Sequence, residues 1–215
     1  MGCDIHMYVE RKTSRGWFNC DYFVPNVNYK EPTCVNSARY FKDESSKYQH
    51  VPIYDGRNYA LFATLADVRN YGNTAYISEP KGFPEDACDY IKDQYESWYG
   101  DAHSASYLTL QELIDFHKAG YPLKRRGMLS PEQLEDFDNG VLPDHWCQGT
   151  NIYGYEFREW EEENDVLVPL IEKLKDRADE LYMIYKFYWD SNDEHCRESA
   201  YKAAADIRIV FWFDN

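Results

Sequence analysis

Four polar side chains occupy alternate positions near the start of the chain: Asp4, His6, Tyr8 and Glu10. Successive side chains of a strand point to opposite faces, so these four share one face and the apolar residues between them face a core. Asp4 and His6 are then about 6 to 7 Å apart, which suits a shared ligand, a metal ion or a proton transfer. We take both as candidate catalytic and metal-binding residues, and Glu10 as a candidate ligand contact. A hydrogen-bonded histidine at a sheet edge, without chemistry, is the alternative.

A second polar group, residues 101–106, precedes a capping-box signature formed by Thr109 and Glu112. A loop that leads into a helix N-terminus offers free amide groups to an anion. His103, Ser104 and Ser106 add side-chain donors, so this predicted loop could hold a phosphate, with His103 also a catalytic candidate. Alternatively, Ser106 only orders the turn before the helix.

A third group lies in the segment Asp55–Tyr59, at the predicted start of a helix. Arg57 could bind a phosphate through two nitrogens, or it could form a structural ion pair with Asp4, Glu10 or Glu79. The same alternatives apply to Arg69. The candidate ligand contacts from this part of the chain are Arg57, Asn58, Arg69 and Glu79. The sequence lacks the P-loop, dinucleotide-binding, zincin and nucleophile-elbow motifs.

Hydrophobic periodicity predicts the elements that position these groups. The expected strands are 2–10, 17–24 and 206–215, and the last is central because it is apolar on both faces. The expected helices are 59–69, 85–98 with Pro84 at or near its first position, 110–118, one starting at Ser130-Pro131, 166–189 and 194–205. The expected loops are 25–56, 70–84, 100–106 and 139–155. We expect a single α+β domain over residues 1–215, with a small, mostly antiparallel sheet that contains both terminal strands.

Composition limits the classes of partner. The net charge is −15, which disfavours direct nucleic-acid binding, and 17% of the residues are aromatic, enough to line a pocket with rings. Residues 131–165 carry 11 acidic side chains and one basic one, Arg158, a solvated surface or a docking site for a basic partner. The six cysteines form no CxxC pair, and no apolar run could span a membrane. We therefore expect a cytoplasmic protein with free thiols.

Several segments together resemble a family of largely uncharacterised bacteriophage and bacterial proteins. They are Gly2–His6, Asp55–Tyr59, 61–63, 65–69, 78–80, 103–109 and 211–215. The resemblance covers nearly the whole chain but implies no reaction. Members often carry a histidine where this chain has Ala105, so a two-histidine mechanism in that loop is not implied here. The resemblance implies an accessory role in a host cytoplasm, including interference with host defence signalling.

Three functions follow as hypotheses. The first is a protein that binds and sequesters a phosphate-bearing, nucleotide-like small molecule, with aromatic rings stacked on the base. The second is a phosphoester or nucleotide hydrolase in which Asp4 and His6 hold a divalent metal, and Glu10 or Asp214 orients them. The third is an acidic decoy that binds a host nucleic-acid-binding protein through residues 131–165.

Overall fold

The computed structural model describes residues 2–29, 47–149, 151–188 and 204–214, without the side chains of residues 181–188. The strands are β1 (Asp4–Thr13), β2 (Gly16–Asn19), β3 (Tyr22–Pro25), β4 (Tyr48–Val51), β5 (His103–Thr109), β6 (Leu123–Leu129), β7 (Glu156–Glu162) and β8 (Ile207–Asp214). The helices are α1 (Tyr59–Ala66), α2 (Asp89–Glu96), α3 (Leu110–Ala119), α4 (Pro131–Asp138) and α5 (Val168–Tyr188), with a 3₁₀ turn η2 (Ala204–Asp206). The chain is therefore α+β, as the sequence predicted.

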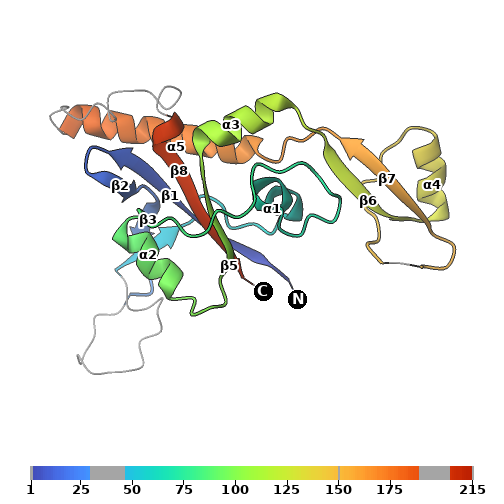
Figure 1. Ribbon diagram of the computed structural model, residues 1–215, viewed down its shortest axis with the longest axis horizontal. Coiled ribbons are helices and arrows are strands. Elements are labelled where there is room, and N and C mark those ends of the chain that lie inside the picture. Colours follow the sequence, from blue (N-terminus) through green and yellow to red (C-terminus); the bar gives the residue numbers. More distant parts are fainter. Residues whose placement is uncertain (1, 30–46, 150, 189–203, 215) are drawn as a thin grey trace.

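The main sheet has the strand order β2-β1-β8-β5, and all its pairs are antiparallel. The first and last described strands lie side by side at its centre (Figure 1). Asp4 is directly opposite Asp214, and His6 is opposite Trp212. The prediction that both terminal strands share one sheet, with the last in a central place, is confirmed.

Both faces of this sheet are covered, because β8 is apolar on each of them. Phe211 and Phe213 face a core that α1, α3 and α5 complete, whereas Val210 and Trp212 face a second cluster that includes Ile91 of α2. On β1, the alternating apolar residues join the first core as predicted, but Tyr8 and Glu10 are also buried. The polar face of β1 is therefore covered at Tyr8 and Glu10, where α2 and the chain around it lie against it (Figure 1).

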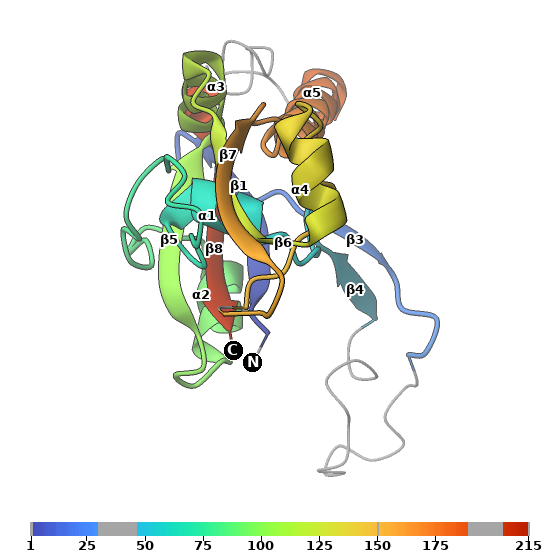
Figure 2. The same cartoon turned by 90° about the vertical axis from the view of Figure 1, so that its right-hand side faces the viewer.

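Two smaller ribbons extend from this body. Strands β6 and β7 pair antiparallel and carry α4, and we call residues 121–164 the arm, since they project to one side (Figure 1). Strands β3 and β4 form the other ribbon (Figure 2). The arm meets the body where Thr74 contacts the backbone of Lys124: the amide of Lys124 donates to Thr74 Oγ1 at 2.6 Å.

Several predicted elements are confirmed, and their local signals explain them. Asn58 caps α1, accepting from two amides of its first turn. Thr109 with Glu112, and Ser130 with Gln133, form complete capping boxes at α3 and α4. The long helix at 166–189 is observed as α5, and the loops at 70–84 and 139–155 lack helices and strands in their described parts, apart from one isolated bridge between Cys147 and Met128. The predicted helix 194–205 falls mostly outside the described residues.

The predicted strand 17–24 is observed as two strands: β2 pairs with β1 as expected, and the chain then leaves the sheet before β3. The amide of Cys20 still donates to the carbonyl of Val9, but the next partner of β1 is a side chain: Asp21 Oδ1 accepts from the amide of Val9 at 3.1 Å. The chain then forms β3, which pairs with β4 inside a segment predicted to be irregular throughout.

The helix expected over 85–98 is shorter. The amide of Cys88 donates to the buried Glu10 at 2.7 Å, so the chain is fixed to β1 and α2 begins only at Asp89. Pro84 therefore lies before the helix and not at its first position. Strands β6 and β7 were not predicted. None of the helices in the described residues is long and apolar enough to cross a membrane.

Candidate functional site

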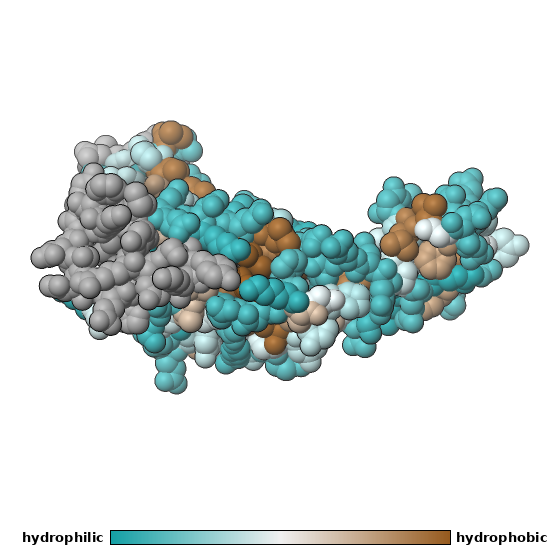
Figure 3. Space-filling view, turned by 90° about the horizontal axis from the view of Figure 1, so that it is seen from above, coloured by the Kyte–Doolittle hydropathy of each residue, from teal (hydrophilic) through white to brown (hydrophobic). Residues whose placement is uncertain are grey.

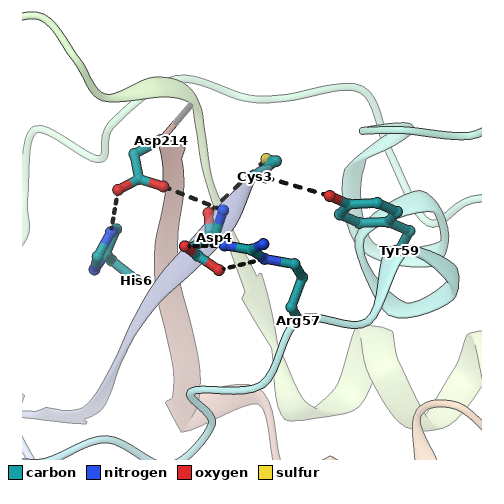
Figure 4. A network of polar contacts seen from close by, with 6 residues as sticks. All are labelled: Cys3, Asp4, His6, Arg57, Tyr59 and Asp214. Atoms are coloured by element: carbon teal, nitrogen blue, oxygen red, sulfur yellow. Dashed lines mark hydrogen bonds and ion pairs between the residues drawn. The ribbon is translucent and has the colours of Figure 1, made fainter. Parts of the chain in front are cut away.

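Polar residues from three segments meet where β1 begins and β8 ends. We call Asp4, His6, Arg57 and Asp214 the sheet-end cluster (Figure 4). Asp214 links the two strands: its Oδ1 accepts from the amide of Asp4 at 3.1 Å, and its Oδ2 lies 3.3 Å from His6 Nε2. The sequence predicted Asp4, His6 and Arg57 as site residues and Asp214 as an orienting group, and the fold brings these four together.

Arg57 and Asp4 form a two-point ion pair. Nε donates to Oδ1 at 2.8 Å and Nη2 to Oδ2 at 2.6 Å, and both side chains are about half exposed. The hydrogen bond from Arg57 lowers the pKa of Asp4 below its ordinary value. Gly2 makes this placement possible, since a Cβ at that position would lie 2.4 Å from Arg57 Nη1. Of the two roles considered for Arg57, the ion pair with Asp4 is therefore observed.

His6 is held between a carboxylate and two indole rings. Its ring centroid is 4.0 Å from that of Trp98 and 5.9 Å from that of Trp212, and its side chain is 24% exposed. The carboxylate of Asp214 on one imidazole nitrogen fixes the orientation of the ring, as a general base or acid requires. Trp98, which precedes the loop to β5, was not predicted, and only its place in an aromatic-rich segment could have indicated it.

His103 does not join His6. It lies opposite Phe213, which faces the first core, whereas His6 lies opposite Trp212, which faces the second. Residues directly opposite in a sheet share a face, so the two histidines are on different faces. His103 Nδ1 lies 3.1 Å from Ser104 Oγ, and its Nε2 is buried without a partner in the described residues.

The predicted phosphate-binding loop at 100–106 is wrong in structure, because His103–Thr109 form β5. Pairing with the central β8 overrides a polar composition that is typical of loops, and a register shift between His103 and Ser106 absorbs the irregular start. Two donors at the start of α3 are already used: the amide of Glu112 donates to Thr109 Oγ1, and the amide of Thr109 to Glu112.

Glu10 is not a ligand contact. Its side chain is fully buried, its Oε2 accepts from Arg208 Nε at 2.7 Å, and its Oε1 accepts from the amide of Cys88. Arg208 in turn lies over Trp17, with its guanidinium carbon 3.9 Å from the ring centroid. Burial of this saturated pair between β1 and β8 gives Glu10 a structural role and leaves Asp214 as the residue that orients His6.

Three further candidates have structural partners. Ser106 is fully buried and accepts from the amide of Lys81 at 3.2 Å. Asn58 caps α1, as described above. Glu79 accepts from the hydroxyl of Tyr76 at 2.6 Å. None of these three belongs to the sheet-end cluster.

Arg69 lies between the sheet-end cluster and a second polar region. The amide of Cys3 donates to the hydroxyl of Tyr59 at 3.3 Å. Arg69 lies near the thiol of Cys3: burial raises the pKa of that thiol, while the hydrogen bond and charge of Arg69 lower it. Arg69 also donates to the hydroxyl of Tyr71 at 3.1 Å. Tyr59, Arg69 and Tyr71 all line a crevice between α1 and the arm.

This basic crevice combines positive charge with aromatic rings. Its charged lining residues are Arg69, Lys124, Arg125 and Arg126, and its rings are Tyr59, Tyr71 and Trp146. No acidic side chain lines it. It adjoins a cavity of about 400 Å³ that shares Gly72 and the three basic residues of β6, and that adds Glu159 and Glu161. The crevice itself has a volume of only about 50 Å³, and the adjoining cavity is the part whose size is within the range of small-molecule sites.

Two contacts of Arg125 determine which cations of the crevice remain available to a ligand. Arg125 pairs with Glu162 at 2.5 Å and lies 5.3 Å from the ring centroid of Trp146, so its charge is used to hold that ring. Lys124 and Arg126 are exposed, and neither belongs to an ion pair among the described residues. Arg69 was among the ligand contacts predicted from the sequence, and the basic residues of β6 were not. Three consecutive basic residues in so acidic a chain were the signal.

A metal ion would find few ligands at the sheet end. Within the described part of the chain there is no group of three or more His, Cys, Asp or Glu side chains that could hold one. Both carboxylate oxygens of Asp4 already accept from Arg57. Asp4 and His6 therefore stand as partners of Arg57 and Asp214.

Comparisons with known proteins give no further guide: no protein-family model, curated protein or solved structure matches the chain.

Proposed function

We propose that the protein binds a phosphate-bearing, nucleotide-like small molecule in the basic crevice. The observation that carries the proposal is local charge reversal: a chain of net charge −15 lines one crevice with four basic residues and no acidic ones. The exposed Lys124 and Arg126, which belong to no ion pair among the described residues, would attract a multiply charged anion. The phosphate class follows from this charge and from the guanidinium donors.

The aromatic residues narrow the ligand further. Tyr71 is exposed and Trp146 is half-buried, and Arg125 holds the Trp146 ring. A planar base stacked on such a ring gains about 1 to 3 kcal/mol. Phosphates at Lys124 and Arg126, with a base at Trp146, would use the charges and the rings of the crevice together. Retention of the ligand without turnover would make the protein a sequestering protein.

The test is isothermal titration calorimetry of the full chain with ADP, pyrophosphate and adenosine. We expect ADP to bind more tightly than pyrophosphate, and adenosine to bind most weakly. Arg126→Ala and Lys124→Ala should each weaken ADP binding about tenfold, equivalent to about 1.4 kcal/mol. Both side chains are exposed, so melting temperatures should stay near that of the parent.

Arg15→Ala and Arg57→Ala are matched controls, because each removes a cation outside the crevice. Equal losses in these controls would mean that ADP responds only to net charge. Undiminished ADP binding in the Lys124 and Arg126 variants, or no binding of any probe to the parent, would refute the proposal.

A second candidate function is hydrolysis of such a ligand with His6 as general base. The contact between His6 and Asp214 favours it, since an oriented and partly exposed imidazole can accept a proton. Release of phosphate from ADP or ATP that is lost in His6→Ala, while binding is kept, would support it. Binding without turnover in the parent would leave sequestration as the function.

A further inference from the structure

The arm carries an apolar groove on the side of α4. Its lining combines Val141, Leu142 and Pro143 of the loop after α4 with Trp146, Cys147 and Tyr155, and its volume is about 670 Å³. Val141 is 57% exposed and Leu142 48%, high values for two consecutive branched aliphatic side chains. Figure 3 shows an apolar patch on the projecting end of the molecule, surrounded by hydrophilic residues. We call this surface the arm groove.

The arm is not needed to cover the main core. The buried residues of β6 and β7, including Leu129 and Trp160, lie outside the cluster that packs on the main sheet. Phe137 and Trp146 instead pack edge-on against Trp160, which gives the arm a small apolar centre of its own. A projecting ribbon that leaves aliphatic side chains in water is typical of an interaction surface.

The rim of the arm groove has one sign of charge. Glu132 and Asp136 of α4 line it, together with Asp144, and all three are exposed. Its imidazole, His145, is already in contact with Asp144, and the pKa of Asp144 is lowered by that hydrogen bond. The groove contains no lysine or arginine. Charge complementarity therefore defines the partner: cationic side chains at the rim and apolar ones on the floor.

We infer that the arm groove binds a Lys/Arg-rich segment of a partner protein, anchored by apolar side chains on Val141 and Leu142. An amphipathic segment offers this combination, with apolar anchors at helical spacing and cations beside them. The basic crevice lies where the arm joins the body and has the opposite charge, and the two sites share one lining residue, Trp146.

The experiment is fluorescence anisotropy with a synthetic fluorescein-labelled peptide that has Leu and Lys/Arg at helical spacing. Two control peptides replace either all cations by Glu or all Leu by Ser. We expect only the first peptide to bind the full chain, and its affinity to fall as salt rises. The double variant V141S/L142S and the variant Asp136→Lys should each weaken binding at least tenfold.

Glu172→Lys is the matched control, because it reverses an exposed charge on α5, outside the groove. Binding that drops equally in this control would mean attraction to net charge alone and would overturn the inference. Equal binding of the Leu-to-Ser peptide would also overturn it. Light scattering tests whether a second copy of the chain occupies the groove instead. If the parent is a dimer and V141S/L142S is a monomer, the groove is a contact between two copies of the chain, and the inference is overturned.

Discussion

Two ion pairs on β1 have the same chemistry and different surroundings. Asp4 and Arg57 are half exposed, whereas Glu10 and Arg208 are almost completely buried. Exposed pairs contribute little to stability because water and salt screen them. Buried pairs are costly to break, because the remaining charge has no water and no partner. Asp4 and Arg57 are therefore accessible to a ligand, whereas Glu10 and Arg208 stabilise the sheet.

Asp4 should titrate below the ordinary range of an aspartate, because Arg57 stabilises its charged form. A lowered pKa in the folded state gives stability above the unfolded value, about 3.9. That contribution is lost as the pH falls through the folded pKa. A carboxyl-detected NMR titration should show the low pKa in the parent and a rise towards 3.9 in Arg57→Ala.

Gly2→Ala gives a charge-neutral control for this titration. The added methyl group would displace the guanidinium of Arg57, so the pKa of Asp4 should rise in this variant as well. If the pKa of Asp4 is ordinary in the parent, the two-point ion pair does not form in solution.

Glu10→Ala should destabilise the protein by about 3 to 5 kcal/mol, because it leaves Arg208 buried and unpaired by its main partner. Urea denaturation measures the loss. Asp86→Ala is the matched control: Asp86 contacts the same arginine at 2.9 Å, but its side chain is 65% exposed, so its loss should matter much less. A parent-like midpoint for Glu10→Ala would contradict the structural role given to this residue.

At the scale of elements, the sequence predicted the helices and strands whose formation depends on neighbouring residues. Capping residues and 3.6-residue periodicity indicated α1, α3, α4 and α5, and the doubly apolar Ile207–Asp214 indicated a central strand. Sequence-based prediction failed for strands whose formation depends on a partner far away in the sequence. The composition of His103–Ser106 is typical of a loop, but pairing with β8 makes this segment the start of a strand. The sequence of β6 has no alternating apolar pattern.

The charge pattern of β6 and β7 explains why these strands pair and why the sequence did not predict them. Lys124 lies opposite Glu161, and Arg126 opposite Glu159, so opposite charges face each other across the two strands. Such pairs favour an antiparallel ribbon. However, the partners are more than 30 positions apart in sequence, and a local reading places the glutamates on an undivided acidic surface. The basic crevice was missed for the same reason, although Arg69 was among the candidates.

Asn58 provides a test at this scale, because it was a candidate ligand contact and is observed as a cap. Asn58→Ala should cost about 1 kcal/mol of stability, since two amides at the start of α1 lose their acceptor. Asn58→Ser should retain most of the stability, and neither variant should change ADP affinity. A tenfold loss of ADP affinity in Asn58→Ala at unchanged stability would restore the ligand role.

The whole molecule divides its tasks between body and arm. The body buries both terminal strands between two layers and holds the sheet-end cluster at one end of them (Figure 2). The arm adds no residue to the main core, and it carries one side of the basic crevice and all of the arm groove. The crevice therefore depends on how the arm meets the body, and the arm groove does not.

Gly72 controls this junction. A Cβ at Gly72 would lie 2.1 Å from the carbonyl oxygen of Lys124, so Gly72→Ala should force the loop and β6 apart. Hydrogen exchange should then accelerate in β6 and β7, while the amides of β1 and β8 keep their protection, because those report on global unfolding. ADP binding should weaken, and binding of the cationic peptide should not.

Gly149→Ala is the control for this junction variant, because its Cβ would meet the end of the Ile152 side chain at 3.3 Å, within the arm, and not a backbone carbonyl at the junction. It should leave both exchange and ADP binding unchanged. If Gly72→Ala instead accelerates exchange equally in β6 and β8, the arm and the body unfold as one unit. The division of tasks between them would then have no basis in stability.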